Sequence, residues 1–354
     1  MQGITLSPRP AKGRLQGVIL AYRLRWKRRR FLFRIWRKRH EISVLIDRTE
    51  TIGKTDILLF CCLRNEAVRL PHFLAYYRKL GVNHFLFVDN DSTDGSAALL
   101  AKQPDASVWT TRHSYRLARF GMDWLGKLMF RFGHNHWCLV VDADELFAYA
   151  DSETTTLSTL TQALERQGQH SMGALMLDLY PKGGLQEWTY HPGDDPTQML
   201  CWFDHDNYRA SYHPYYGNLW IQGGARERVF FADTPQKSPT LNKFPLIKWN
   251  RRFVYVSSTH QALPPRLHEG FDFKSGTKAS GVLLHTKFLP IVAEKSAEEL
   301  HRRQHFAHPE AYGPYHQALT TNLTLWTPKS TRFTNTQDLE KMKLIQRPTS
   351  TTFG

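Results

Sequence analysis

The sequence lacks several features that would place it in a familiar class. Its four cysteines, Cys61, Cys62, Cys138 and Cys201, include no C-x-x-C spacing, so a reducing compartment is expected rather than a disulfide framework or a zinc site. The longest uncharged stretch near the N-terminus, residues 15–22, is far shorter than the ~20 apolar residues of a spanning helix, and no signal-peptide cleavage site follows it. There is no internal repeat. With 41% hydrophobic residues among 354, the chain can bury a full core.

Acidic residues are missing from the first 40 positions, which hold thirteen Lys and Arg. These residues supply +13 of the formal charge of +15, so the rest of the chain is nearly neutral. Aromatic residues such as Trp26, Phe31 and Trp36 are interleaved with the charges. A basic helix of this kind can lie in the headgroup layer, and we predict that residues 1–40 dock on an anionic membrane surface. The alternatives are a solvated tail, an import signal or a nucleic-acid-binding arm, but the body shows no nucleic-acid recognition motif.

Strand-like and helix-like segments alternate from residue 55 onward. An unbroken apolar run at 56–63 is typical of a strand covered on both faces. At 66–80, apolar residues recur three and four apart and Gly81 follows, which predicts a helix. Further strands are predicted at 84–88, 106–110, 137–141 and 174–179, and further helices at 93–102 and 157–167. This alternation predicts an α/β fold with a doubly wound, mostly parallel sheet and helices on both faces.

Polar clusters follow three of the predicted strands, where open α/β sheets bind their ligands. The clusters are Arg64-Asn65-Glu66, Asp89 to Gly95, and Asp142-Ala143-Asp144-Glu145. Asp142 and Asp144 are two residues apart on extended backbone, so their side chains leave on the same side. Two carboxylates this close repel each other, and a divalent cation, Mn²⁺ or Mg²⁺, would relieve the repulsion. The alternative is one helix-capping Asp and one solvated Asp.

Taken in order, four segments resemble the family 2 type of glycosyltransferase, and more narrowly a bacterial subgroup related to family 92. They are Leu63 to Glu66, His72 to Val82, Phe87 to Gly95 and Leu139 to Leu146, with weaker echoes at 223–230, 243–248, 258–260 and 283–288. The resemblance covers about residues 57–290. It implies a GT-A domain at 51–300, between a basic N-terminal arm at 1–50 and a C-terminal helix or tail at 301–354. The implied activity is transfer of a sugar from a nucleotide-diphosphate donor.

The resemblance also implies roles for individual residues. The donor nucleoside would be held by the first two clusters, through Arg64, Asn65, Glu66, Asp89 and Asp91. Asp142 would face the ribose and reach the metal through water, while Asp144 would coordinate the cation directly. His285 would be a further metal ligand, although a lone histidine in an apolar strand is otherwise a structural residue.

A diphosphate leaving group gains negative charge as the glycosidic bond breaks, so the site needs fixed positive charge there. Arg226, Lys248 and Lys287 are predicted to help the metal supply it, with ordinary surface charge as the alternative. An inverting transfer, which we expect, also needs a general base. Glu227 lies between two arginines in a segment that begins with two glycines, and it is the predicted base. The alternative for Glu227 is that it is an ion-paired surface residue. The rival candidates for the general base are Asp178, Asp204 and Asp206.

Together these inferences predict a metal-dependent glycosyltransferase with a nucleotide-sugar donor and a glycan or lipid-linked acceptor. We expect a role in bacterial surface polysaccharide or lipopolysaccharide synthesis, with the protein in the cytoplasm, peripheral on the inner face of the membrane. One alternative is a metal-dependent nucleotidyltransferase, but that class would be expected to show a Gly-rich phosphate loop near the first strand, and residues 63–66 are not one. A hydrolase with paired carboxylates is a further alternative, but it needs facing groups about 5 Å or more apart rather than neighbouring Asp residues at one strand end. The alternative of another class is a nucleic-acid-binding protein that uses the basic arm.

Overall fold

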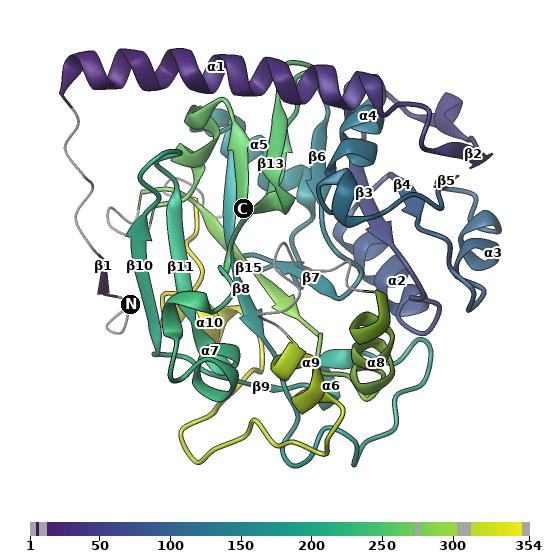
Figure 1. Ribbon diagram of the computed structural model, residues 1–354, viewed down its shortest axis with the longest axis vertical. Coiled ribbons are helices and arrows are strands. Elements are labelled where there is room, and N and C mark those ends of the chain that lie inside the picture. The colour runs from purple at the N-terminus through teal and green to yellow at the C-terminus, as the bar shows by residue number, and fades with distance from the viewer. Residues whose placement is uncertain (1–4, 7–12, 273–276, 303–312, 349–354) are drawn as a thin grey trace.

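The computed structural model describes residues 5–6, 13–272, 277–302 and 313–348 (Figure 1). A nine-stranded sheet at its centre has the order β2-β5-β4-β3-β6-β12-β8-β15-β7. In chain order these strands are β2 (Ser43–Ile46), β3 (Ile57–Leu63), β4 (His84–Asp89), β5 (Ala106–Thr110), β6 (Trp137–Val140), β7 (Glu145–Ala148), β8 (Ser171–Asp178), β12 (Asn242–Lys248) and β15 (Ser280–His285).

Six of the nine strands point the same way. β5, β4, β3 and β6 pair in parallel in that order, and β15 is parallel to β8. Because β12 is antiparallel to both β6 and β8, β8 runs in the direction of β6. Only β2, β12 and β7 run the other way within this sheet. The predicted α/β fold with a doubly wound, mostly parallel sheet is therefore confirmed.

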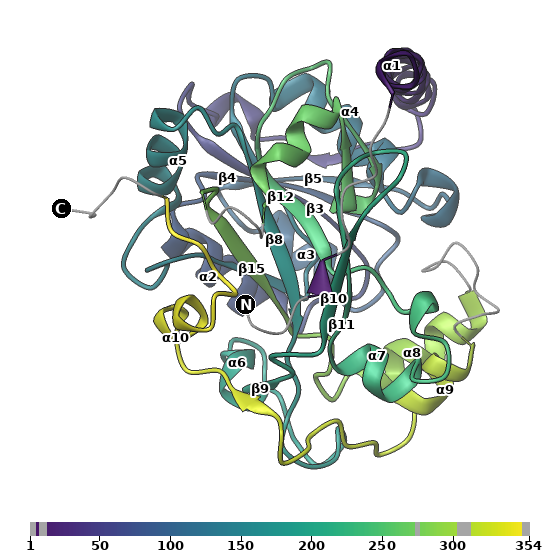
Figure 2. The ribbon, with the colours of Figure 1, turned by 90° about the vertical axis from the view of Figure 1, so that its left-hand side faces the viewer.

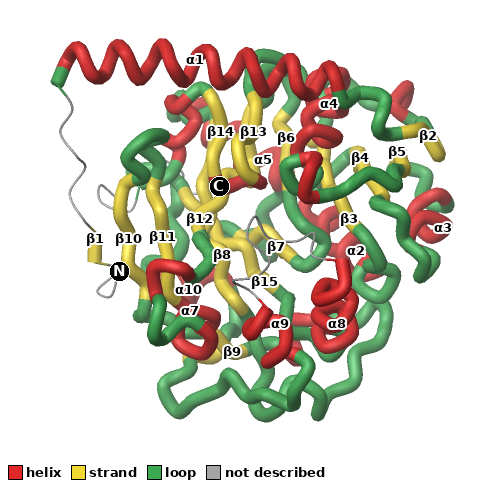
Figure 3. Tube along the Cα trace, in the orientation of Figure 1, coloured by secondary structure: helices red, strands yellow, loops and turns green. Residues whose placement is uncertain are grey.

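Helices cover both faces of the sheet. Right-handed crossovers place α2 (Leu70–Leu80) and α3 (Ser96–Ala101) on one face and α4 (Met122–Phe132) on the other. Figure 2 shows α2 and α4 on opposite sides of the strands. The remaining helices are α1 (Arg14–Arg37), α5 (Leu157–Arg166), α6 (Pro196–Met199), α7 (Gly224–Phe230), α8 (Val292–Arg302), α9 (Gly313–Leu319) and α10 (Thr336–Lys341). α1 lies at one end of the molecule and α7, α8 and α9 at the other (Figure 3).

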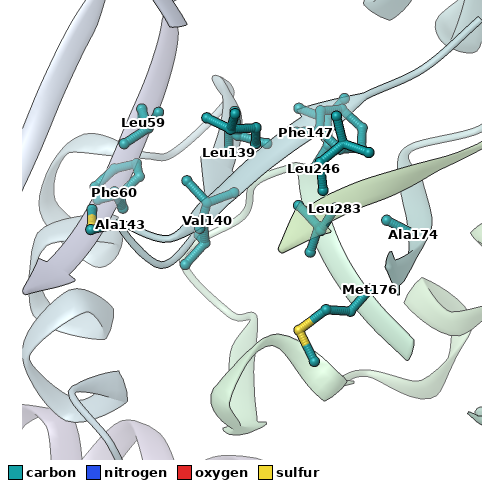
Figure 4. Packing of buried hydrophobic residues seen from close by; sticks show 14 of the residues in the cluster. Leu59, Phe60, Leu139, Val140, Ala143, Phe147, Ala174, Met176, Leu246 and Leu283 are labelled. Carbon is teal, nitrogen blue, oxygen red and sulfur yellow. The ribbon is translucent and has the colours of Figure 1, made fainter. Parts of the chain in front are cut away.

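The hydrophobic core lies along the central strands. Every residue of β3, β4 and β6 is buried, as expected for strands covered on both faces. Figure 4 shows this packing from close by, with Leu59 and Phe60 of β3, Leu139 and Val140 of β6, Ala174 and Met176 of β8, Leu246 of β12 and Leu283 of β15. This rigid layer holds the strand ends, and the polar clusters that follow them, in fixed positions.

Smaller sheets surround the main one. β1 (Thr5–Leu6), β10 (Tyr208–Tyr212) and β11 (Leu219–Gly223) form one of them, and the hairpin β13 (Val254–Ser257) and β14 (Gln261–Leu263) forms another. In the C-terminal segment, β16 (Thr331–Arg332) pairs with β9 (Trp202–Phe203), and Leu339, Leu344 and Ile345 are buried. The described part of the predicted tail therefore packs on the body, while residues 303–312 and 349–354 lie outside the described residues.

The basic N-terminal arm contains α1, a helix of 24 residues. Its side chains Leu24 and Ile35 are buried in a small second core with Val254 and Leu263. Residues 1–4 and 7–12 of the predicted arm lie outside the described residues. Across the part of the chain that the structure describes, no helix combines the length and the apolar content needed to cross a bilayer.

A buried histidine predicts that the fold loses stability in mild acid. Burial lowers the pKa of His268 to about 4, and its Nε2 accepts a hydrogen bond from the Ala262 amide at 3.0 Å. Between pH 6.5 and pH 4 the unfolded chain binds a proton that the folded chain does not, so stability falls as the pH falls through this window. Protonation of His268 accounts for a loss of about 2 kcal/mol in the free energy of unfolding between pH 7 and pH 5.

Urea unfolding at these two pH values measures the loss. In His268→Gln, the difference in unfolding free energy between pH 7 and pH 5 should shrink by that amount. A variant that keeps the full difference would show that another group titrates.

Candidate active site

A cavity of about 590 Å³ opens at the carboxyl ends of β3 and β6. From β3 the chain proceeds outward to β4 and β5, and it then crosses back to β6, so the strand order reverses between β3 and β6. Such a reversal point is where open α/β sheets bind their ligands. Seven of the predicted site residues line this cavity: Arg64, Glu66, Asp142, Asp144, Arg226, His285 and Lys287.

The cavity favours an anionic ligand. Its lining holds seven Lys or Arg side chains against five Asp or Glu, and three further histidines. The basic residues are Arg64, Arg69, Arg226, Lys237, Lys243, Lys287 and Lys295. Low-dielectric walls lined by an excess of one charge concentrate the field on a ligand of the opposite charge.

Asp142 is bound by a lysine that the sequence analysis did not single out. The ammonium of Lys243 lies 2.7 Å from Asp142 Oδ2 and also contacts the carboxylate of Glu145. Glu145 in turn accepts a hydrogen bond from the Asp142 amide at 3.1 Å. Lys243 and Glu145 are both buried, and burial lowers the pKa of Lys243 less than the two carboxylates raise it. The lysine is therefore charged, and it supplies the positive charge that Asp142 needs.

Asp144 has a different partner, the imidazole of His285. His285 Nε2 lies 3.3 Å from Asp144 Oδ2, and His285 Nδ1 lies 2.6 Å from Asp178 Oδ1. Arg226 Nε lies 2.7 Å from the other oxygen of Asp178. Burial alone would raise the pKa of Asp144, but His285, Arg69 and Lys287 hold it well below its usual value. Asp144 is therefore a carboxylate, and Asp178 fixes the orientation of the histidine ring.

The pair of Asp144 and His285 fits a divalent cation as a partial ligand set. A hydrogen bond from Nδ1 to a carboxylate, as Asp178 allows, leaves Nε2 free to ligate, which is the usual arrangement of metal-bound histidine. Among the described residues, however, no group of three or more His, Cys, Asp or Glu is placed to hold a metal. A cation here would need oxygens from a phosphate ligand or water to complete its coordination, as Mg²⁺ and Mn²⁺ sites commonly do.

Arg64, Asn65 and Glu66 form the turn after β3. Asn65 has a φ of 54°, in the left-handed region, and its amide donates to Ser92 Oγ at 2.9 Å. Glu66 is ion-paired with Arg69 at 2.8 Å and with Lys295 of α8. The turn is thus held between the loop that follows β4 and α8, with Arg64 and Glu66 in the cavity wall. Asn65 is not part of that wall.

Asp89 and Asp91, which were predicted to line the nucleoside pocket, are not among the cavity-lining residues. Asp89 Oδ1 accepts the Ser92 amide at 3.0 Å and organises the loop after β4. Asp91 lies near two guanidinium groups, 3.6 Å from Arg64 and 3.3 Å from Arg112. In this structure both aspartates brace the loop that supports the wall.

The three predicted phosphate-binding cations divide into two groups. Arg226 and Lys287 line the cavity, and the ammonium of Lys287 lies 6.0 Å from the centre of the Tyr315 ring. Burial lowers the pKa of Lys287, an effect that Asp144 opposes. Lys248 instead lies at the end of β12 opposite Trp137, where β6 begins, and it pairs with Glu165 at 2.7 Å. Lys248 therefore lies away from the predicted donor site, at the end of the sheet opposite the cavity.

Glu227, the predicted base, is not among the residues that line the cavity. It is ion-paired with Arg209 and accepts a hydrogen bond from Ser238 Oγ at 2.5 Å. Its rival Asp204 is held by Arg228 at 2.8 Å, and Asp178 is committed to His285 and Arg226. The geometry gives Glu227 the ion-paired role that was its alternative, and we do not carry it into the proposed function.

Comparisons with known proteins add little to this picture. No protein-family model matches the chain, and no curated protein matches it. Among solved structures, the chain is similar to the mannosyltransferase PcManGT from Pyrobaculum calidifontis in complex with GDP-Man and Mn²⁺, with 16% identity over 46% of this chain and 47% of that one and a TM-score of 0.25. The match thus spans about half of that mannosyltransferase.

Two further solved structures are similar at the same level. One is a putative glucose-1-phosphate thymidylyltransferase from Bacillus anthracis, with 10% identity over 84% of this chain and 97% of that one and a TM-score of 0.27. The other is the UTP-bound UGPase from Acinetobacter baumannii, with 10% identity over 55% and 75% and a TM-score of 0.28. These TM-scores are too low to support an assignment, so the function is argued from the geometry of the cavity.

Proposed function

We propose that the protein is a metal-dependent glycosyltransferase that uses a nucleotide-diphosphate sugar as its donor. The observation that carries the proposal is the cavity at the strand-order reversal, which brings Asp144 and His285 together with Arg226 and Lys287. A carboxylate and an imidazole on one side and fixed cations on the other match a donor whose diphosphate becomes more negative as it leaves. The order of the sequence motifs supports the same class.

Each group has a proposed task at the donor. A divalent cation bound by Asp144 and His285 would supply positive charge at the leaving diphosphate. Lys287, whose ammonium lies 6.0 Å from the centre of the Tyr315 ring, would contact a phosphate oxygen, and Arg226 would add charge from the position that Asp178 gives it. Asp142, held by Lys243, has its second oxygen available to accept a hydrogen bond from a ribose hydroxyl.

The acceptor and the place of action complete the proposal. We propose a glycan or lipid-linked acceptor in bacterial surface polysaccharide or lipopolysaccharide synthesis, with the enzyme on the inner face of the cytoplasmic membrane. Two features support this placement: the motif resemblance, and the basic helix α1, which carries nine Lys or Arg and no acidic residue.

Release of nucleotide from a panel of UDP-, GDP- and dTDP-sugars tests the donor and the cation together. We expect one nucleotide class to give nucleoside diphosphate in the presence of Mn²⁺, and EDTA to abolish the release. Pyrophosphate formed from a nucleoside triphosphate and a sugar phosphate would instead identify a nucleotidyltransferase. If no nucleotide sugar is turned over and none raises the melting temperature, the proposal is wrong.

Lys287→Met tests the contribution of this cavity-lining cation. Removing one preorganised positive group at a developing negative charge lowers kcat/KM by about 10²-fold. Lys248→Met is the matched control, since that lysine lies at the far edge of the sheet and pairs with Glu165. We expect the control to keep its activity. Steady-state rates with the donor found in the panel measure both variants, and equal rates for the two would remove Lys287 from the donor site.

A further inference from the structure

The outward face of α1 is exposed although the helix is part of the fold. Figure 1 shows α1 lying across one end of the molecule, and the end-on view in Figure 2 shows it at the edge of the body. Its inward side chains Leu24 and Ile35 are 4% and 6% exposed and pack on the β13–β14 hairpin. The opposite side of the helix, which carries Leu15, Tyr22 and Trp26, is exposed.

Specific contacts hold the helix in this position. Arg34 Nε lies 2.7 Å from Asp123 of α4, whose side chain is fully buried. A Cβ added to Gly126 of α4 would lie 2.6 Å from Ile35 Cδ1, so the glycine lets the two helices approach closely. The described part of the predicted basic arm is thus docked on the body. Any surface that α1 presents therefore has a fixed orientation relative to the body.

An apolar stripe runs along the outward face. Leu15, Ile19, Tyr22, Trp26 and Phe33 are four, three, four and seven positions apart, the spacing of one helical face, and each is between 45% and 73% exposed. Across the described residues, eleven large hydrophobic side chains are at least 45% exposed, and seven of them belong to α1. Such a concentration on one helix marks an interaction site.

Positive charge borders the stripe on both sides. Exposed arginines, among them Arg25, Arg29 and Arg30, alternate with the apolar residues, and the helix has no acidic residue. The Arg29 guanidinium lies over the Trp26 ring at 5.3 Å, and Phe33 stacks on Trp36 at 5.6 Å. Nucleic acid would account for the cations but not for the apolar stripe between them. Anionic phospholipid accounts for both, because its headgroups attract arginine while its acyl region accepts the aromatic rings.

We propose that α1 is an in-plane membrane helix that inserts the stripe from Leu15 to Phe33 into an anionic phospholipid surface while its opposite face stays docked on the body. At 24 residues it offers about 36 Å of contact length. Arg119, whose guanidinium lies 4.3 Å from the Phe31 ring, precedes the cavity-lining Phe120. The docked helix thus holds the cavity wall in a defined position relative to the lipid. The inference does not depend on the chemistry of the donor.

Vesicle co-sedimentation of the full chain tests the proposal. The wild type should bind phosphatidylcholine vesicles that contain phosphatidylglycerol much better than vesicles of phosphatidylcholine alone, and added salt should weaken the binding. The variant Tyr22→Ser/Trp26→Ser/Phe33→Ser removes apolar area without touching the docked face, and its partitioning should fall at least about tenfold. Trp188→Ser, a change of an exposed tryptophan outside the helix, is the control and should bind like the wild type.

Two outcomes would overturn the proposal. One is unchanged vesicle binding by the triple variant with its melting temperature preserved. The other is wild-type binding to an oligonucleotide duplex, undiminished in the triple variant, with no binding to either vesicle. The variant Arg25→Gln/Arg29→Gln/Arg30→Gln keeps the stripe, so it should lose the preference for phosphatidylglycerol. Retention of that preference would contradict the electrostatic part of the proposal.

Discussion

Asp144→Ala is expected to lower kcat/KM for sugar transfer by about 10³-fold or more while leaving the protein folded. The carboxylate is proposed to hold the cation at the leaving diphosphate. The fold should survive because the structural contacts of Asp144 are made by its backbone. Its carbonyl accepts the Thr286 amide at 2.7 Å and the Thr286 hydroxyl at 3.0 Å, and neither bond involves the side chain. The side chain is half-buried at the cavity and faces His285.

Measurement of kcat/KM at several Mn²⁺ concentrations, together with thermal melting, separates the chemical effect from a folding effect. Glu165→Gln is a suitable control. It too alters a carboxylate that faces a cation, but it does so at the opposite edge of the sheet, beside Lys248. We expect this control to keep its rate. Full transfer by Asp144→Ala at saturating Mn²⁺ would show that the carboxylate is not needed for the reaction.

Most of the sheet could be predicted from the sequence because the buried strands are nearly continuous apolar runs. The strand predicted at 56–63 is β3 (Ile57–Leu63), and the one predicted at 106–110 is β5. The first of these helices begins later than predicted, at Leu70 rather than residue 66, because residues 64–65 form a bend in which Asn65 is left-handed and residues 67–69 form a turn. A turn that carries a site does not follow the periodicity of the helix after it.

The arm was harder to predict, because charge dominates its composition. Leu24 and Ile35 are eleven residues apart, which places them on one helical face, but they are only two apolar residues among many in α1. What makes them a docked face is the partner surface, with Gly126 on α4 and Val254 on β13. A partner surface built by distant segments of the chain leaves no local signal in the helix itself.

The site shows a second limit, which concerns the direction of a strand. Looking for polar residues after the carboxyl ends of strands finds Arg64 and Asp142, since β3 and β6 are parallel. β12 lies between β6 and β8 but runs the other way, so its beginning is at the cavity and its end is at the opposite edge. The echo at 243–248 holds both lysines, and Lys248 was the one predicted at the site, whereas Lys243 lies beside Asp142. Only the pairing of the strands reveals this, and pairing is a long-range property.

Lys243→Met should lower the free energy of unfolding by about 3–5 kcal/mol, because it leaves a buried carboxylate without its cation. The side chain of Lys243 is 4% exposed and that of Glu145 is 1% exposed, so water cannot replace the lost charge. Asp142, at 42% exposed, can rehydrate and contributes less. Lys248→Met removes the cation of an exposed pair, and we expect it to cost no more than about 1 kcal/mol.

A second substitution distinguishes loss of charge balance from loss of packing. In Lys243→Met/Glu145→Met both buried charges are gone, and an apolar pair of similar volume can recover much of the lost stability. Urea unfolding midpoints of the single and double variants measure this coupling. Because Asp142 is no longer held, donor binding should stay weak in the double variant even where its stability is restored. A double variant as unstable as the single one would mean that Lys243 acts through its packing, and the role of its charge in positioning Asp142 would fall with that result.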